Sequence, residues 1–335
     1  MELPKISVVM PTFNSEKTLA LALDSIRMQD YPQDKVEIII ADGGSRDHTL
    51  DIAKKYTDKI FANPLKTGEA GKAVGVKHAT GEIVALIDSD NILPERDWFK
   101  RMVEPFSDDT IVGSEPLYYT YRKEDGYITR YCALIGMNDP LCLFMGNYDR
   151  YCVLTGKWTE MEIKQSDKGR YLKIDLNEKQ IPTIGANGFL IRKNGLEQCS
   201  ISAYLFDIDV IYELTLQDHN HYAKVKVGII HIFSGTISTF VRKQRRRIKD
   251  YSYYNKLNLR RYPWGKLDKQ NIFKFFVFSV LIVPLLGQVV IGLTKKRDPA
   301  WIFHIPACWL TLVIYGYGTF QNYLVREKPE DRSKW

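Results

Sequence analysis

The stretch EIVALIDSDN, residues 82–91, is the most informative segment for predicting the fold. Its apolar part is short, rich in β-branched residues and nearly continuous, which is typical of a strand buried on both faces. The run stops at two carboxylates two positions apart, Asp88 and Asp90. Two earlier runs, ISVVMP (6–11) and VEIIIAD (36–42), have the same character. We therefore expect three buried strands, each followed by polar residues.

Helix-like segments follow the strands, at residues 15–30, 45–56 and 68–79. This alternation predicts an α/β fold with a doubly wound, mostly parallel sheet. Ligands of such sheets bind outside the carboxyl ends of the strands, where this chain has PTFN, DGGS and DSD. Neither glycine-rich phosphate motif, GxGxxG or GxxxxGKS/T, is present, so a dehydrogenase-like or kinase-like site is not expected.

The Asp-x-Asp at residues 88–90 predicts a divalent cation site at this edge. Carboxylate oxygens suit Mg²⁺ or Mn²⁺, and such an ion can bridge a diphosphate and neutralise its charge when it leaves. An alternative stays open, because Asp-x-Asp is also a common turn that caps a following helix, here expected at residues 94–106.

Three ordered blocks carry a resemblance to a known family: ISVVMPTFNSEKTLALALDSIRMQ, IIIADGGSRDHTLDIAKKY and GKAVGVKHATGEIVALIDSDN. They resemble the family-2 glycosyltransferases, which have a GT-A fold. The resemblance is dense over residues 5–110 and thins toward residue 248. It implies a metal-dependent, inverting transfer of a sugar from a nucleoside diphosphate sugar, with Mg²⁺ or Mn²⁺ as cofactor.

The resemblance also implies roles for individual side chains. Those expected to bind the donor are Pro11, Thr12, Asn14, Glu16, Asp42, Lys72, Asp88, Gly185 and Asn187. Those expected to hold the metal are Asp90, Asp88 and His231. The expected catalytic base is Asp207, with Asp209 as the alternate. Structural alternatives remain open: a turn at Asp42, a solvated helix face at Lys72, a helix cap at Asp207 and a buried core histidine at His231.

The segment RKQRRRI, residues 242–248, resembles the family's Gln-x-x-Arg-Trp signature. Gln244 and Arg247 are in place, and the resemblance implies that they bind the donor. Ile248 stands where processive members have Trp, which counts against polymer synthesis. The arginines here also fit a contact with anionic lipid or a solvated basic helix.

The net charge of +7 favours anionic partners, of which we expect nucleotides and phospholipids and no nucleic acid. Two apolar segments, 271–294 and 301–325, are each long enough to cross a bilayer. Pro284 predicts a kink in the first. Two full spans and a re-entrant or monotopic arrangement therefore both remain open. The basic stretch before them places the catalytic domain on the cytoplasmic face of the membrane.

These features predict the division of the chain. The expected parts are a catalytic domain at 1–241 (nucleotide-sugar half about 1–110, acceptor half about 111–241), a basic juxtamembrane segment at 242–270, two apolar membrane helices at 271–325 and a polar tail at 326–335. The expected acceptor is lipid-linked: a polyprenyl phosphate, a lipid-linked glycan or a glycolipid. The alternatives are a nucleotidyltransferase and a non-catalytic, nucleotide-binding membrane scaffold.

Overall fold

The computed structural model describes residues 2–263 and 269–324, so the predicted polar tail at 326–335 lies outside the described residues. The chain divides into two compact units. The sheet unit consists of the chain up to Tyr118 and of Glu162–His231; the helical unit consists of Tyr119–Met161 and of the chain from Ile232 to the last described helix. This division differs from the expected one, because residues 119–161 group with the C-terminal helices.

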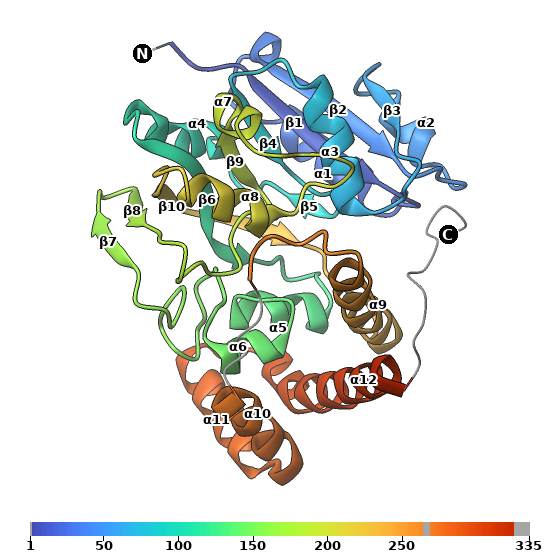
Figure 1. Ribbon diagram of the computed structural model, residues 1–335, viewed down its shortest axis with the longest axis vertical. Helices are drawn as coiled ribbons and strands as arrows, with labels where there is room; N and C mark the ends of the chain where they lie inside the picture. Colours follow the sequence, from blue (N-terminus) through green and yellow to red (C-terminus); the bar gives the residue numbers. More distant parts are fainter. Residues whose placement is uncertain (1, 264–268, 325–335) are drawn as a thin grey trace. The chain divides into compact units, whose positions relative to one another are not determined.

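Four parallel strands form the first half of the sheet (Figure 1). They are β1 (Ile6–Thr12), β2 (Val36–Asp42), β3 (Ile60–Ala62) and β4 (Ile83–Leu86), in the order β3-β2-β1-β4. Val8, Ile39 and Ala85, on three neighbouring strands, are fully buried. Burying a Val or Ile side chain contributes about 1.5–3 kcal/mol. The predicted α/β class is confirmed.

Three helices connect these strands: α1 (Leu19–Arg27), α2 (Thr49–Ala53) and α3 (Gly68–His78). The first two are shorter than the sequence predicts, because the residues before them bond across two loops. The backbone N–H of Asn14 donates to Ser45 Oγ (2.9 Å), and that of Ser15 donates to Thr49 Oγ1 (2.7 Å). Asn14 also has φ +49°, which no residue of a right-handed helix adopts.

The second half of the sheet is antiparallel, so the sheet as a whole is mixed. Its strands are β6 (Ile111–Thr120), β7 (Lys164–Asp167), β8 (Tyr171–Asp175), β9 (Phe189–Arg192) and β10 (His221–His231), which continue the order as β4-β9-β6-β10-β8-β7, and β5 (Asn91–Ile92) pairs with β10. The remaining helices of this unit are η1 (Gln33–Lys35), α4 (Trp98–Val103), η2 (Glu104–Ser107), α7 (Lys193–Glu197) and α8 (Asp207–Thr215). The pairing of β9 with β4, and of β10 with β5, brings late segments of the chain beside the Asp-x-Asp.

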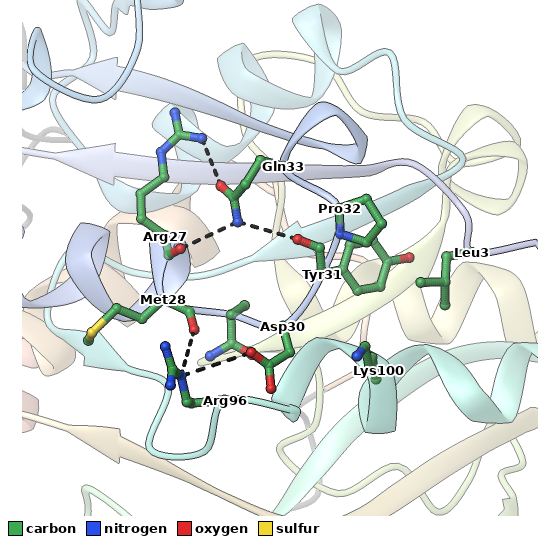
Figure 2. A pocket seen from close by; sticks show the side chains of 10 residues that line it. Leu3, Arg27, Met28, Asp30, Tyr31, Pro32, Gln33, Arg96 and Lys100 are labelled. Carbon is green, nitrogen blue, oxygen red and sulfur yellow. Dashed lines mark hydrogen bonds and ion pairs between the residues drawn. The ribbon is translucent and has the colours of Figure 1, made fainter.

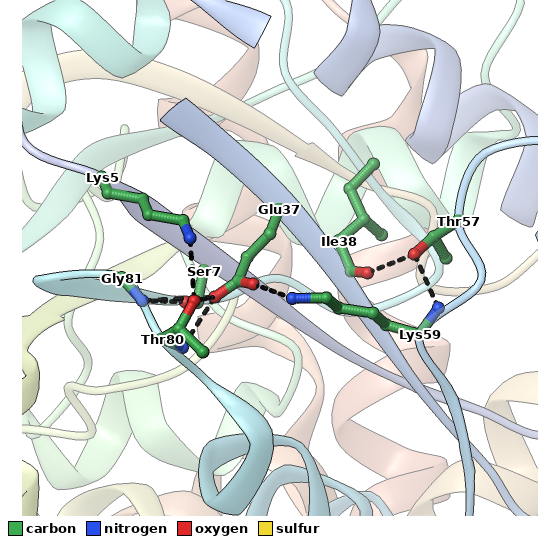
Figure 3. Close-up of polar contacts among 8 residues, drawn as sticks. All are labelled: Lys5, Ser7, Glu37, Ile38, Thr57, Lys59, Thr80 and Gly81. Carbon is green, nitrogen blue, oxygen red and sulfur yellow. Dashed lines mark hydrogen bonds and ion pairs between the residues drawn. The ribbon is translucent and has the colours of Figure 1, made fainter. Parts of the chain in front are cut away.

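A carboxylate ties the strands together near their amino-terminal ends (Figure 3). Glu37 accepts hydrogen bonds from the Ser7 hydroxyl, the Lys59 ammonium, the Thr80 N–H (2.7 Å) and the Thr80 hydroxyl (2.9 Å). Burial alone would raise the pKa of Glu37, but these donors outweigh it and lower the pKa to about 2. The Glu37 carboxylate therefore connects β1, β2 and the turn before β4 by hydrogen bonds.

The helical unit is built mainly of helices. They are α5 (Tyr127–Ile135), α6 (Pro140–Met145), α9 (Ile237–Lys256), α10 (Lys269–Leu281), α11 (Val283–Lys295), η3 (Pro299–Phe303) and α12 (His304–Leu324). Their shared core is rich in aromatic rings, of which Tyr131 and Trp301 are fully buried. A Cβ added at Gly292 of α11 would lie 2.4 Å from the Trp301 ring, so a glycine is needed for this close approach.

The predicted apolar segments are helical, but they differ from each other in shape. Residues Pro299–Gln321 form one helical stretch that is long and apolar enough to cross a membrane. Helices α10 and α11 pass the same test only as a pair, and the pair is bent by 91°. The bend lies at Ile282, one residue before α11 begins and two before Pro284, so the predicted kink is confirmed.

Candidate functional site

The first two strands of the parallel half end in a closed network of turns in the sheet unit. Asp42 accepts hydrogen bonds from the Thr12 hydroxyl (2.9 Å), the Gly44 N–H (2.9 Å), the Ser45 N–H (2.8 Å) and the Ser45 hydroxyl (2.6 Å). Asp42 is buried, and its oxygens hold the turn that the sequence offered as an alternative. Any contact of Asp42 with a nucleobase has to share these oxygens with the turn.

The loops after β1 and β2 also bond to each other. Asn14 Oδ1 accepts from the Arg46 N–H (2.9 Å), and Glu16 Oε2 accepts from the His48 N–H (3.2 Å). Pro11 packs against α3, where a Cβ at Gly71 would lie 2.7 Å from its Cβ. Pro11, Asn14 and Glu16, three of the predicted donor-binding residues, therefore lie close together where β1 and β2 end.

The Asp-x-Asp follows β4 and lies off its end. The Asp88 N–H donates to Asn91 Oδ1 (3.0 Å), and the Asn91 N–H donates to the Asp88 carbonyl (2.9 Å), so the motif is held in a tight turn. Asp90 Oδ2 lies 3.4 Å from His231 Nε2, because the pairing of β5 with β10 brings Asn91 opposite His231. Two of the three predicted metal ligands thus meet across the sheet.

The residues present fit a divalent cation that takes only part of its coordination from protein. Within residues 2–263 and 269–324, no group of three or more His, Cys, Asp and Glu side chains is placed to hold a metal ion. Mg²⁺ is bound in many nucleotide sites by one or two protein side chains together with substrate phosphates and water. Asp90 offers a carboxylate oxygen, which suits Mg²⁺ or Mn²⁺, and the His231 nitrogen beside it is a ligand type more common for transition metals than for Mg²⁺.

Asp207, the predicted base, is the first residue of α8, and it forms an ion pair with Lys72 of α3. Lys72 Nζ lies 2.9 Å from Asp207 Oδ1 and 2.8 Å from Oδ2. Burial, together with the negative charge of Asp88, raises the pKa of Asp207 to about 6, against the opposing effect of the Lys72 ammonium. Burial by itself would lower the pKa of Lys72, but the charges of Asp207 and Asp88 more than reverse this. Lys72 therefore remains a cation, and Asp207 is the member of the pair that titrates near neutral pH.

The alternate base, Asp209, lies in the same first turn of α8 and is buried. Asp207 is the one whose geometry is defined by a bidentate contact with a cation at this edge.

A loop at residues 183–188 contacts both Asp207 and the Asp-x-Asp turn. Gly185 has φ +115°, and a Cβ added to it would lie 2.9 Å from Asp207 Cβ, so only glycine fits between the loop and α8. Asn187 Oδ1 accepts from Asn91 Nδ2 (3.0 Å), which connects the loop to the Asp-x-Asp turn. Gly185 and Asn187, both predicted from sequence, thus connect Asp207, the predicted base, with the predicted metal motif.

An ion pair that the sequence analysis did not identify anchors this loop. Glu115 Oε1 accepts from the Gly185 N–H (2.9 Å), and Glu115 Oε2 lies 2.6 Å from Lys224 Nζ. Both charged side chains are completely buried. The available signal was a charged residue inside each of two apolar strands: Glu115 in VGSEPLYY, and Lys224 (with Lys226 two positions on) in YAKVKVGII. The pairing itself joins residues 109 positions apart, which no local pattern reveals.

Gln244 and Arg247 lie on α9 in the helical unit, and their contacts there are internal. Arg247 Nη1 donates to Gln244 Oε1 (2.7 Å) and lies 3.4 Å from Asp139 Oδ2. The Tyr315 hydroxyl of α12 contacts both Asp139 (2.5 Å) and Gln244 (2.9 Å). Within this unit, the two signature residues join α9 to α12 and to the start of α6.

A hollow of 690 Å³ lies elsewhere on the sheet unit (Figure 2). Its lining includes Leu3, before β1, and Pro32, before β2, so it opens near the amino-terminal edge. Three of its charged side chains contact neighbours: Arg27 donates to Gln33 (3.2 Å), and Arg96 lies 3.9 Å from Asp30. It contains no predicted site residue, and ligands of such sheets bind at the opposite edge.

Comparisons with known proteins identify the family and the fold of this chain. Residues 7–198 match the family model described as glycosyl transferase family 2. The chain belongs to glycosyl transferase family 2. Its fold is similar to that of the mannosyltransferase PcManGT from Pyrobaculum calidifontis, solved with GDP-Man and Mn²⁺, with a TM-score of 0.54, 15% identity, and coverage of 98% of this chain and 89% of that one. The predicted GT-A fold is thus confirmed.

Relatives with described activities match about a third of this family-2 chain or less. A poly(ribitol-phosphate) beta-N-acetylglucosaminyltransferase, TarS, from Staphylococcus aureus is 38% identical over 95 residues, which are 27% of this chain and 17% of that protein. A dolichyl N-acetyl-alpha-D-glucosaminyl phosphate 3-beta-D-2,3-diacetamido-2,3-dideoxy-beta-D-glucuronosyltransferase from Methanococcus voltae is 36% identical over 108 residues, which are 30% and 33% of the two chains. The chain spans no more than a third of the length of either relative.

Proposed function

We propose that this chain is a metal-dependent, inverting glycosyltransferase that moves a sugar from a nucleoside diphosphate sugar to a lipid-linked acceptor. The observation that carries the proposal is the geometry of Asp207. Lys72 Nζ contacts both carboxylate oxygens of Asp207. The pKa of Asp207 is about 6, and the charge of Asp88 in the Asp-x-Asp motif contributes to raising it. A general base works best when its pKa lies near the operating pH.

Asp90 and His231 would hold the cation, together with the donor's phosphate oxygens. When bound, a divalent ion supplies charge neutralisation for the departing diphosphate. The similar mannosyltransferase structure contains Mn²⁺ and a nucleotide sugar. Asn91 accepts a hydrogen bond within the Asp-x-Asp turn and donates one to Asn187, so the turn and the loop at residues 183–188 are connected.

The chain's own groups account for the proton in the proposed step. The acceptor oxygen forms a bond to the anomeric carbon, and the bond from that carbon to the diphosphate oxygen breaks, with its electron pair leaving on the diphosphate. Where the acceptor is a hydroxyl of a lipid-linked glycan or glycolipid, Asp207 accepts the proton that this hydroxyl loses. A polyprenyl phosphate acceptor is already anionic and has no such proton to lose. Lys72 orients the carboxylate through both oxygens. Attack from the side opposite the leaving group inverts the anomeric configuration.

A lipid-linked acceptor is supported by two observations. The helical unit exposes large apolar side chains, among them Phe273, Val283 and Phe320. The relative from Methanococcus voltae is named for a dolichyl-phosphate-linked substrate. We propose that the chain works at the cytoplasmic face of a membrane, with a polyprenyl phosphate, a lipid-linked glycan or a glycolipid as acceptor.

The test offers purified full-length chain a panel of nucleotide sugars, Mg²⁺ or Mn²⁺, and a lipid extract, and identifies glycosylated lipid by mass spectrometry. The proposal expects a sugar-lipid product and free nucleoside diphosphate, both dependent on the cation and lost in Asp90→Ala and Asp207→Asn. Release of pyrophosphate would instead indicate a nucleotidyltransferase. Nucleotide binding without any turnover across the panel would indicate a scaffold.

A further inference from the structure

The bent pair α10–α11 is too short on each side of its bend to cross a bilayer. Each helix has 13 residues, which correspond to about 20 Å at 1.5 Å per residue. The hydrocarbon core is about 30 Å thick. Ile282 at the bend has φ +61°, a conformation that β-branched residues avoid. Buried Phe275 and Leu285 anchor the two helices in the core on either side of it.

The outer surface of this pair is apolar at the bend and cationic at both ends. At the bend, Leu281 is 60% and Val283 is 72% exposed. Further exposed apolar side chains on the same pair are Phe273, Phe276, Val280, Ile282, Leu286, Val290 and Ile291. Exposed cations lie at the ends, at Lys269 before the bend and at Lys295 and Arg297 after it. An apolar turn between two cationic ends fits insertion from one side of an anionic lipid surface.

The packing of α12 against α9 argues against a span by α12. The Tyr315 hydroxyl contacts Gln244, and a Cβ added at Gly318 would lie 2.9 Å from side-chain atoms of Ile248. Residues 315–318 therefore lie beside residues 244–248. If Pro299–Gln321 crossed the membrane, residues 315–318 would be about 8–12 Å from its midpoint, inside the roughly 15 Å half-thickness of the hydrocarbon.

The neighbouring stretch of α9 could not follow α12 to that depth. Between residues 242 and 249 it carries six Lys or Arg residues. Arg245 and Arg246 are exposed, and the Arg246 side chain has 67% of its surface accessible. Charged side chains exposed to lipid at membrane depth are strongly unfavourable. The same cations are favourable next to lipid phosphates at the surface.

One face of α12 is suited to lie along such a surface. Trp309, Val313, Tyr317 and Phe320 are 47–63% exposed and follow one another at spacings of four, four and three, so they share one face of the helix. Trp and Tyr are enriched at the boundary between hydrocarbon and headgroups.

We propose that the helical unit is monotopic: it enters a single leaflet of an anionic bilayer with the bend of α10–α11, while α12 lies in the interface and the cations of α9 meet lipid phosphates. No part of the described chain crosses to the far side. The inference deepens the membrane association included in the proposed function, and its tests measure topology and binding without any turnover. Sugar transfer and monotopic insertion can therefore fail separately.

The topology test places single cysteines at Gln270→Cys, Arg297→Cys and Gln321→Cys in sealed membrane vesicles, in a chain in which Cys142 and Cys199 are changed to Ser. A membrane-impermeant maleimide is added before or after detergent. The monotopic arrangement predicts equal labelling of all three positions before detergent. Labelling of Arg297→Cys and Gln321→Cys from opposite sides would show that α12 spans the bilayer. A difference between Gln270→Cys and Arg297→Cys would show that the bent pair spans. Either result would overturn the proposal.

The binding test compares Leu281→Glu with Leu216→Glu in flotation with phosphatidylglycerol-containing vesicles. The two leucines are similarly exposed, at 60% and 57%, but Leu216 lies in the sheet unit. Leu281→Glu should weaken binding on the order of tenfold or more, since a charge would enter the hydrocarbon, whereas Leu216→Glu should bind like wild type. Val283→Glu repeats the test at the most exposed apolar position of the bend. Equal binding by all four proteins would overturn the proposal, and so would undiminished binding to neutral phosphatidylcholine vesicles.

Discussion

The two edges of the parallel half of the sheet use carboxylates in opposite ways. Near the amino-terminal edge, donors from Ser7, Lys59 and Thr80 surround Glu37, and its pKa falls to about 2 (Figure 3). At the carboxyl edge, burial raises the pKa of Asp207 to about 6 even though Lys72 contacts both of its oxygens. The first carboxylate stays charged and stabilises the fold. The second can gain and lose a proton near neutral pH, so environment and not residue type separates the two roles.

The largest effect is expected from the same chemical change made at each edge. Asp207→Asn should lower kcat by roughly 10³-fold, because an amide cannot accept the acceptor's proton. Glu37→Gln, the matched control, should leave kcat at 25 °C within about twofold, since the fold stays in excess over the unfolded state. Initial rates at saturating donor measure both. Similar losses in the two variants would remove the functional distinction between the edges.

The next effect concerns the buried pair that anchors the glycine loop. Glu115→Gln keeps an acceptor for the Gly185 N–H but leaves the Lys224 ammonium buried without its counter-charge. Breaking such a pair lowers the free energy of unfolding by about 3 kcal/mol or more. Chemical denaturation measures this loss, and the double variant Glu115→Gln/Lys224→Met should recover part of it. If the double variant is less stable than the single one, the two side chains do not act as a pair.

A positioning role for Glu115 makes a separate prediction for catalysis. Gly185 touches Asp207, so a displaced loop should lower kcat about tenfold while the dissociation constant for the nucleoside diphosphate stays within about twofold. Rates per folded molecule and isothermal titration measure the two quantities. An unchanged kcat in folded Glu115→Gln would leave the pair with a purely structural role.

The amino-terminal edge should contribute to stability only above acidic pH. The pKa of Glu37 is lowered in the folded state, so its contribution is present above the unfolded value near 4.5 and is lost as pH falls toward about 2. Wild type should therefore exceed Glu37→Gln in free energy of unfolding by about 2 kcal/mol at pH 7, discounted for the half-exposed Lys59, and the difference should shrink below pH 4.5. Urea denaturation at pH 7, 4 and 3 checks this, and a difference that does not depend on pH would contradict it.

The smallest effect is a shift in the pH dependence of activity. Lys72 lowers the pKa of Asp207, while burial, Asp88 and Glu69 raise it. Removing the ammonium in Lys72→Met should therefore raise that pKa and move the acid limb of the kcat profile upward by about one pH unit. Lys77→Met, an exposed position on the same helix, is the control and should leave the limb in place. A limb that stays near pH 6 in Lys72→Met would indicate that another group titrates.

Local pattern predicted much of the parallel half of the sheet and its polar rim. The apolar runs at 6–11, 36–42 and 82–88 are strands or strand ends, because a strand buried on both faces must be apolar nearly throughout. The helices at 15–30 and 45–56 were predicted too long. Hydrogen bonds between the loops at Asn14 and Ser45 depend on both strands being paired, and periodicity within one segment does not report them.

The antiparallel half and the grouping of residues 119–161 were less accessible from sequence. Strands β7 and β8 are short and partly exposed, so their residues lack the apolar signal that marked the first strands. Residues 119–161 supply α5 and α6, whose buried side chains pack into the core of the helical unit. A segment's apolar content shows that it is buried but not which partner buries it.

From its sequence, this chain could be assigned to the α/β class and to its family, and its carboxylates could be placed at the ends of the parallel strands. These features depend on short segments whose residue pattern matches a strand or a turn. Only the tertiary structure decided that Lys72 meets Asp207, 135 residues away, that Glu115 meets Lys224, and that α12 lies against the cations of α9. The reason is physical: a local pattern records how much each segment must be buried, whereas contacts between distant segments arise from the one packing that satisfies all of them together.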